Sequence, residues 1–164
     1  MLRMKLLTCI FAFWVVLFTI PLVTSAQTVN IPDPNLRDAI ADTLNKQQGV
    51  VITKEDMETL VNLEARDREI TDLTGLAFAT NLQDLDLRNN VINDLSELTE
   101  LNQLTEVHLG GNAIIDISPL DGKITLAVLT IDNNSISNLQ PLSGLINLEV
   151  LNISNNVIDN LSPL

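Results

Sequence analysis

The sequence repeats with a fixed period of 22 residues, without an insertion, over most of its length. Four complete blocks cover residues 70–91, 92–113, 114–135 and 136–157, and a truncated fifth covers residues 158–164. A chain with a fixed period of this size folds as a stack of similar coils, since a single coil cannot bury its apolar side chains alone. The repeat therefore predicts an elongated structure with one continuous core.

Apolar residues occupy equivalent positions in every block. Three columns are Leu82/Leu104/Leu126/Leu148, Leu85/Val107/Leu129/Leu151 and Leu87/Leu109/Ile131/Ile153. The last two columns lie two residues apart, which is the spacing of side chains on one face of a strand. We expect one short strand per block, at residues 84–87, 106–109, 128–131 and 150–153. Further apolar columns, which begin at Ile70, Leu73 and Leu76, are expected to face the core from the returning half of each coil.

A polar column interrupts this apolar pattern at Asn90, Asn112, Asn134 and Asn156. Asparagine carries both a hydrogen-bond donor and an acceptor, so at the bend after a strand it can pair with backbone groups of its own coil and of a neighbouring coil. A buried backbone group without a partner costs about 1–3 kcal/mol, which explains a recurrent polar residue among leucines. We expect a structural asparagine ladder, in preference to a row of ligands for a metal or a sugar.

Two segments of the repeat resemble a known family. The first is the LxxLxLxxN pattern of Leu82, Leu85, Leu87 and Asn90, and the second is the returning segment DISPL at residues 116–120. Both resemble the 22-residue class of bacterial internalin-type leucine-rich repeats, from about residue 50 to residue 164. The resemblance implies an α/β solenoid, a right-handed horseshoe with a parallel β-sheet on its concave side, 3₁₀ turns on its convex side and a small N-terminal helical cap. Members of the family bind protein ligands, often host receptors, through the concave face.

One position departs from the repeat. Lys123 stands where other coils have Ala79, Leu101 and Leu145. We expect the neighbouring Ile124 to take the inward position through a local twist of the chain.

Residues 27–60 have the features of a helical cap, which the open end of a solenoid requires. Asp33 followed by Pro34 is typical of a helix start. Leu36, Ile40 and Leu44 then recur at helical spacing. Thr53 with Asp56 predicts a capping box at the start of a second short helix.

The N-terminal segment has the order of features expected of a secretory signal peptide. Arg3 and Lys5 precede an apolar stretch of 18 residues, Leu6–Val23, which small residues follow. We expect cleavage between Ala26 and Gln27, and therefore a secreted or cell-surface protein that is not inserted in the membrane. An uncleaved membrane anchor is the alternative, because 18 residues is close to the minimum length of a span.

The chain thus divides into a signal peptide at residues 1–26, a cap at residues 27–60 and leucine-rich repeats at residues 61–164. The repeats start with a degenerate first coil, in which Leu60, Leu63 and Ala65 are in register with Leu82, Leu85 and Leu87. The sequence stops halfway through a coil, so we expect it to be a fragment of a longer protein.

Charge and cysteine content narrow the classes of partner. Residues 1–26 contain Arg3 and Lys5 and no acid, so the net charge of −12 becomes −14 after cleavage. A surface this acidic repels nucleic acids and anionic membranes, which bind clustered lysine and arginine. The only cysteine, Cys9, lies in the signal peptide, so the exported chain forms no internal disulfide. Export without disulfides favours a bacterial origin.

The exported residues do not supply a catalytic constellation. The only histidine, His108, stands between Asp86 and Thr130 in the strand columns, where strands about 4.8 Å apart allow an Asp–His contact. This position is expected to be open to water and to lack an oxyanion donor, so we expect a protein that is not an enzyme. One histidine with scattered acids is a poor metal site, and the sequence has no phosphate-binding loop, so we expect no metal and no cofactor.

The outward side chains of the strands form the candidate ligand-binding face. They are Asp84, Asp86, Arg88, Glu106, His108, Val128, Thr130, Asp132, Val150 and Asn152. Val128 and Val150 are expected to expose two stacked apolar side chains ringed by polar groups. This pattern favours a binding module for a protein that brings a basic rim around an apolar centre, or for a glycan. A structural spacer within a larger surface protein is the alternative, and it would present a uniform polar face.

Overall fold

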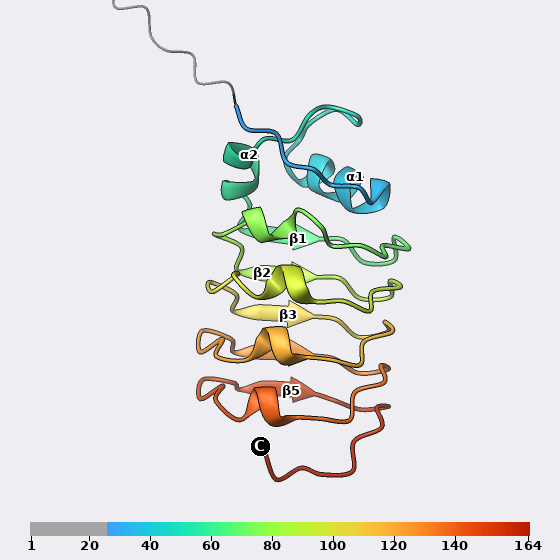
Figure 1. The fold of residues 1–164 in the computed structure, drawn as a ribbon, viewed down its shortest axis with the longest axis vertical. Helices are drawn as coiled ribbons and strands as arrows, with labels where there is room; N and C mark the ends of the chain where they lie inside the picture. Colours follow the sequence, from blue (N-terminus) through green and yellow to red (C-terminus); the bar gives the residue numbers. More distant parts are fainter. Residues whose placement is uncertain (1–25) are drawn as a thin grey trace, which may run out of the picture.

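The computed structural model describes residues 26–164, which form a stack of similar coils capped by two helices (Figure 1). The predicted signal peptide lies outside the described residues, apart from Ala26. Within residues 26–164, no helix combines the length and the hydropathy that crossing a membrane requires.

Each coil contributes one strand, and 3₁₀ turns join successive strands on the opposite side of the core. The cap helices are α1 (Pro34–Thr43) and α2 (Lys54–Glu58). The strands are β1 (Asn62–Glu64), β2 (Asp84–Asp86), β3 (Glu106–His108), β4 (Val128–Thr130) and β5 (Val150–Asn152). The 3₁₀ turns are η1 (Leu76–Phe78), η2 (Ser96–Leu98), η3 (Ser118–Leu120) and η4 (Gln140–Leu142). The strands form one open parallel sheet in sequence order (Figure 1), which confirms the predicted solenoid.

The period of 22 residues sets the register of the sheet. Leu63 pairs with Leu85, and Leu85 pairs with Val107, so the degenerate first coil is in the expected register. Leu85 and Val107 have no exposed surface, as the core columns require. Each strand of the repeats ends one residue earlier than predicted, although the next amide still bonds to the neighbouring strand, as Leu87 N–H does to His108 O at 2.8 Å.

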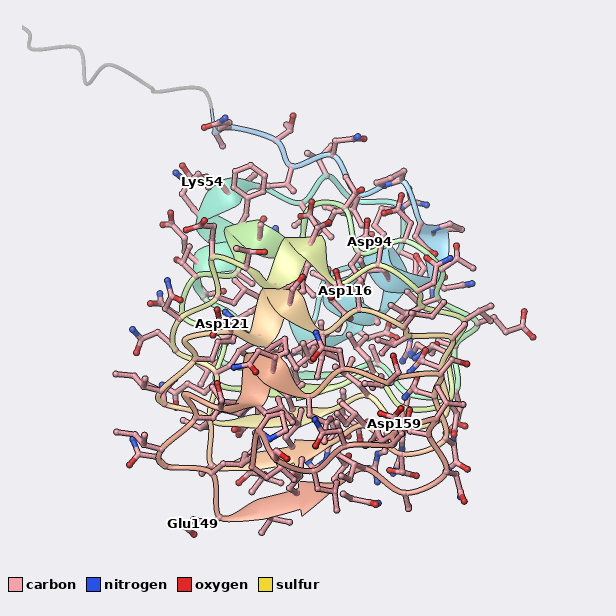
Figure 2. All side chains as sticks on the ribbon, turned by 60° about the horizontal axis from the view of Figure 1, so that its bottom comes forward. Lys54, Asp94, Asp116, Asp121, Glu149 and Asp159 are labelled. Atoms are coloured by element: carbon pink, nitrogen blue, oxygen red, sulfur yellow. The ribbon has the colours of Figure 1, made fainter. Side chains whose placement is uncertain are left out.

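A column of polar side chains holds the convex turns. Asp94 Oδ1 accepts a hydrogen bond from Ser96 N–H at 2.8 Å, and Asp116 Oδ1 accepts one from Ser118 N–H at 2.8 Å. Both aspartates lie beside the turns of successive coils (Figure 2) and are exposed. Asn138 holds the next turn in the same way. These bonds fix the start of η2, η3 and η4 at the same point of the repeat, whereas η1 begins two residues later.

The asparagine column forms a ladder of hydrogen bonds between coils. Asn90 Oδ1 accepts from Ile70 N–H at 3.0 Å. Asn90 Nδ2 donates to Ala65 O at 2.8 Å and to Leu87 O at 2.9 Å. Equivalent bonds are made by Asn112, Asn134 and Asn156. Each carboxamide therefore pairs backbone groups of its own coil and of the preceding coil.

Asp33 joins the cap to the first coil. Its Oδ1 caps α1 by accepting from Asn35 N–H at 2.9 Å and Leu36 N–H at 3.1 Å. Its Oδ2 accepts from Thr71 N–H at 2.8 Å, Thr71 Oγ1–H at 3.1 Å and Asp72 N–H at 3.2 Å. Burial alone would raise the pKa of Asp33, but these hydrogen bonds outweigh it and lower the pKa below its ordinary value. The structure confirms the predicted helix start and adds a link to the repeats.

The start of α2 carries the predicted capping box. Asp56 N–H donates to Thr53 Oγ1 at 3.2 Å, and Thr53 N–H donates to Asp56 Oδ2 at 2.9 Å. Lys46 Nζ donates to the same Asp56 oxygen at 2.6 Å. An antiparallel bridge between Thr28 and Thr53 ties the chain before α1 to the start of α2.

Lys123 occupies the inward position of its column, so the expected exchange with Ile124 is wrong. Lys123 is 2% exposed, whereas Ile124 is 55% exposed. Lys123 Nζ donates to Thr99 O at 3.1 Å and to Leu101 O at 3.2 Å in the preceding coil. The side chain fills the place of a leucine and pairs its ammonium with backbone carbonyls, so no local twist is needed. Burial lowers the pKa of Lys123, and the charge of Glu100 only partly opposes this shift.

Replacing Asn112 or Asn134 by alanine should lower the free energy of unfolding by about 1–3 kcal/mol, because backbone groups of two coils lose their partner. Urea denaturation followed by circular dichroism measures the change. The matched control is Asn102→Ala, since Asn102 is exposed, and it should shift stability by less than about 0.5 kcal/mol. A ladder variant as stable as this control would contradict a stabilising ladder.

Replacing Asp33 by asparagine should lower stability by about 1–3 kcal/mol at neutral pH, because the hydrogen bonds lose a charged acceptor. Since the folded-state pKa of Asp33 is lowered, its contribution is complete above the unfolded-state pKa and is lost as pH falls through the folded-state pKa. The stability difference from wild type should therefore shrink below about pH 4. Urea denaturation at several pH values tests this, with Asp38→Asn on the same helix as control. A difference that is constant with pH would contradict the prediction.

Replacing Lys123 by methionine should remove a rise of stability at alkaline pH. Because the folded-state pKa of Lys123 is lowered, the unfolded chain binds more protons between the two pKa values, and wild-type stability should rise with pH across that interval. The sequence has no tyrosine, so phenol titration does not obscure the effect. Urea denaturation between neutral and alkaline pH measures it. Lys54→Met, at a side chain 42% exposed, should keep the rise, and its persistence in Lys123→Met would refute the assignment.

Candidate functional site

The register of the sheet places the predicted ligand-binding residues in columns on the concave face. The first column is Asn62, Asp84, Glu106, Val128 and Val150. The second column is Glu64, Asp86, His108, Thr130 and Asn152. Neighbours within a column belong to adjacent, directly paired strands, so side chains that are far apart in the sequence form one continuous surface.

Asp86 and Arg88 form an ion pair on this face. Arg88 Nη2 donates to Asp86 Oδ2 at 2.6 Å, and Arg88 Nε donates to Asp86 Oδ1 at 3.0 Å. Burial works to raise the pKa of Asp86, but the hydrogen bonds and charge of Arg88 outweigh it and lower that pKa. The hydrogen bond to Asp86 in turn raises the pKa of Arg88. The charge of Asp86 is therefore largely neutralised within the protein.

His108 is held by residues other than Asp86. Its Nδ1 lies 3.0 Å from Thr130 Oγ1, and its Nε2 lies 3.9 Å from Glu106 Oε2. The hydrogen bond between His108 and Asp86 that strand spacing allowed is not formed: His108 contacts Thr130 in the next strand, and Arg88 donates to the carboxylate of Asp86. In residues 26–164, no group of three or more His, Cys, Asp or Glu side chains is arranged to hold a metal ion.

Gly110 makes room for a charged side chain from the next coil. A Cβ atom at this position would lie 2.7 Å from Asp132 Oδ1, which is closer than real contacts allow. The carboxylate of Asp132 can therefore lie over the backbone of Gly110, two residues after the end of β3, and its charge contributes to raising the pKa of Arg88. The absence of a side chain at Gly110 thus determines where the carboxylate of Asp132 lies on this face.

The two valines differ in exposure. Val150 is 50% exposed, as expected for a residue on an open strand face. Val128 is half-buried between Glu106 and Val150, whereas Val150 stands on the last strand of the sheet and has a column neighbour on one side only. The apolar surface predicted for this column is thus present, but Val150 contributes most of it.

Two residues of β1 extend the face beyond the predicted set. Asn62 and Glu64 are exposed and pair with Asp84 and Asp86. They line a depression of about 340 Å³ together with Leu63, Asp84, Leu85, Asp86, Arg88, Glu106 and His108. The register of Leu63 with Leu85 was the signal that could have identified Asn62 and Glu64, since it also fixes the positions beside Leu63.

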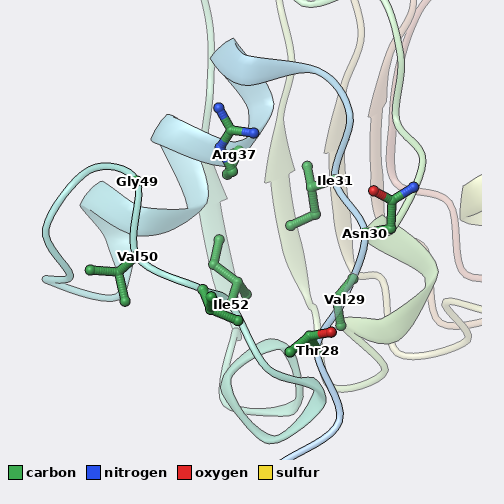
Figure 3. Close-up of a pocket in the computed structure, with 9 residues that line it drawn as sticks. Thr28, Val29, Asn30, Ile31, Arg37, Gly49, Val50 and Ile52 are labelled. Carbon is green, nitrogen blue, oxygen red and sulfur yellow. The ribbon is translucent and has the colours of Figure 1, made fainter.

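A second hollow, of about 600 Å³, lies in the cap and away from the strand face. It is lined by residues 28–31 and 49–52 and by Arg37 (Figure 3). None of the predicted site residues lies in its lining. The hollow lies beside the chain before α1 and the loop between α1 and α2, which are joined there by a hydrogen bond from Val29 N–H to Ile52 O at 2.9 Å.

Comparison with known proteins agrees with this geometry. A family model described as leucine-rich repeats in two copies matches residues 80–122. No curated protein matches the sequence.

Among solved structures, the chain is similar to three internalins of Listeria monocytogenes. Internalin InlF is 28% identical with a TM-score of 0.71, over 87% of this chain and 49% of that chain. Internalin C2 is 32% identical with a TM-score of 0.65, over 87% of this chain and 74% of that chain. The functional domain of InlJ is 28% identical with a TM-score of 0.74, over 85% of this chain and 31% of that chain.

The chain spans about half the length of the InlF structure and most of the internalin C2 structure. The shared features are the parallel sheet, the 3₁₀ turns and the helices at the N-terminal side. With this architecture and 32% identity across most of internalin C2, the chain belongs to the internalin-type family of bacterial leucine-rich repeat proteins.

Proposed function

We propose that this protein is a secreted or cell-surface binding module that recognises another protein through the concave face of its sheet. The observation that carries the proposal is the contrast between core and concave columns. The core column at the centre of the strands keeps leucine or valine in every coil, at Leu63, Leu85, Val107, Leu129 and Leu151. One concave column instead changes from Asn62 through Asp84 and Glu106 to Val128 and Val150.

This contrast favours recognition over a spacer role. A spacer needs only a well-packed core and a soluble surface, so the same residue types can recur at its outward positions in every coil, as they do in the core. A binding surface needs particular side chains at particular places, with apolar spots next to polar ones. Asp84, Glu106 and Val150 supply such a mixture within one column, and Val150 offers apolar contact area that favours a protein over a glycan.

The proposed ligand-binding residues are those of the predicted set: Asp84, Asp86, Arg88, Glu106, His108, Val128, Thr130, Asp132, Val150 and Asn152. Asn90, Asn112, Asn134 and Asn156 have a structural role in this proposal. No catalytic step is part of it, because Asp86 and His108 are engaged with Arg88 and Thr130.

The location outside the cytoplasm is supported by the order of features in residues 1–26 and by the acidic, cysteine-free remainder of the chain. We assign residues 27–60 to a cap and residues 61–164 to the repeats. The resemblance to internalins supports protein recognition through the concave face.

Replacing Val128 and Val150 together by lysine should abolish the capture of candidate protein partners, because two charges would enter the apolar part of the face. Binding is measured by pull-down and by titration with each captured partner. Circular dichroism should stay unchanged, since Val150 is half exposed and neither residue belongs to the fully buried core.

The matched control is the double change Val91→Lys and Val157→Lys, at exposed valines outside the strands. The control should bind as wild type does. Undiminished binding by the concave-face variant, in a protein with unchanged circular dichroism, would place the site elsewhere.

A further inference from the structure

The surface of the solenoid changes character between β3 and β4. On the concave face, Asp84 and Glu106 give way to Val128 and Val150 in the same column. In the turn that leads into each strand, a second column changes in the same direction, from Thr80 and Asn102 to Ile124 and Ile146. Ile124 is 55% exposed and Ile146 is 82% exposed, so neither contributes fully to the core.

The charges of the chain divide at the same place. Residues 27–122 contain 18 acids and six bases, whereas residues 123–164 contain three acids and one base. That single base, Lys123, is buried. The net charge is thus −12 over the first segment and −2 over the second. Two independent features, apolar exposure and charge, therefore mark the same boundary.

We infer that the partner binds in one orientation along the axis of the solenoid, through a segment that is apolar at one end and basic at the other. Its aliphatic side chains lie over β4 and β5, and its lysine or arginine side chains lie over β1 to β3. This inference rests on the proposed function, and it adds which end of the partner meets which coils. The apolar end is defined by Val128 and Val150 on the concave face and by Ile124 and Ile146 in the turns that lead into β4 and β5. The acidic end is defined by Glu64, Asp84 and Glu106.

The acidic end requires a basic partner because its charges are not all compensated within the protein. Asp86 is paired with Arg88, but Glu64 and Glu106 are exposed on the same face. A neutral surface placed over them would remove their hydration without replacing it, which is costly for a carboxylate. The depression of about 340 Å³ beside Asp84 and Glu106 offers room for a basic side chain.

The apolar end requires the opposite chemistry. An uncharged aliphatic surface is favoured there, because contact removes apolar area of both partners from water. Five strands about 4.8 Å apart span about 19 Å, which is the length of about 13 residues of a helix. A single short segment can therefore reach from the apolar end to the acidic end.

The test uses synthetic peptides of this length with leucines in one half and lysines in the other, and a nitroxide label at the lysine end. Titration into the isotope-labelled full chain is followed by NMR. Backbone amides of β4 and β5 should shift, and amides of β1 to β3 should broaden through the label. The control peptide replaces each lysine by glutamate and should bind on the order of tenfold more weakly, as two or three surface ion pairs would allow.

Two variants separate the two ends. Asp84→Asn with Glu106→Gln should lower the affinity for the lysine peptide and leave the affinity for the glutamate peptide unchanged. Ile146→Ser with Val150→Ser should lower the affinity for both peptides. Asp94→Asn with Asp116→Asn is the matched charge control on the convex side, where Asn138 already stands in the same column. It should leave binding of the lysine peptide within about twofold of wild type, since screening weakens distant surface charges.

Broadening centred on β4 and β5, equal affinity for the two peptides, or no binding at all would overturn the inference. The first two results leave the concave face as a binding surface, and the pull-down with the valine variants decides the proposed function separately. Amide shifts confined to the convex side would overturn both.

Discussion

The carboxamide of the ladder asparagine is the interaction on which the rest of the structure depends. After each strand the chain bends away from the sheet, and its backbone groups leave the strand-to-strand pattern of hydrogen bonds. Asn90 satisfies three of these groups at once, in two coils. A shorter or apolar side chain would leave them facing the core unpaired, so the tight bend and the 22-residue period both rely on this residue type.

Because the ladder and the apolar columns carry stability, the concave side chains are free to differ between coils. The backbone holds Asp84 and Val128 in equivalent positions, two coils apart, in spite of their opposite chemistry. The scaffold can therefore present very different side chains on its strands, and the change from an acidic to an apolar surface leaves the packing of the core unchanged. Gly110 shows the same freedom, since there the scaffold presents no side chain and Asp132 fills the space.

Periodicity predicted the parts of the structure that depend on the backbone alone. The strand positions, the register of Leu63 with Leu85 and the order of the sheet follow from counting residues. Contacts that depend on side-chain reach were beyond it. Lys123 is long enough to pair with carbonyls one coil away, and Arg88 holds the carboxylate that Asp86 could have offered to His108. Which partner a side chain contacts depends on its rotamer and on competing partners, and the spacing of residues in the sequence does not determine either.

The ladder also determines the order in which the coils can complete their hydrogen bonds. Each asparagine reaches back to the coil before it, as Asn112 does to Ile92 and Leu87. The proposed secreted protein crosses the membrane with its N-terminus first, so the strand and leucines of a coil emerge before the asparagine of the next coil, which completes the hydrogen bonds. The last backbone groups of that coil stay hydrated until about one further repeat has emerged. Folding in this order leaves a single incomplete coil at the C-terminal side, and the cap that Asp33 attaches to Thr71 provides the first surface on which the coils stack.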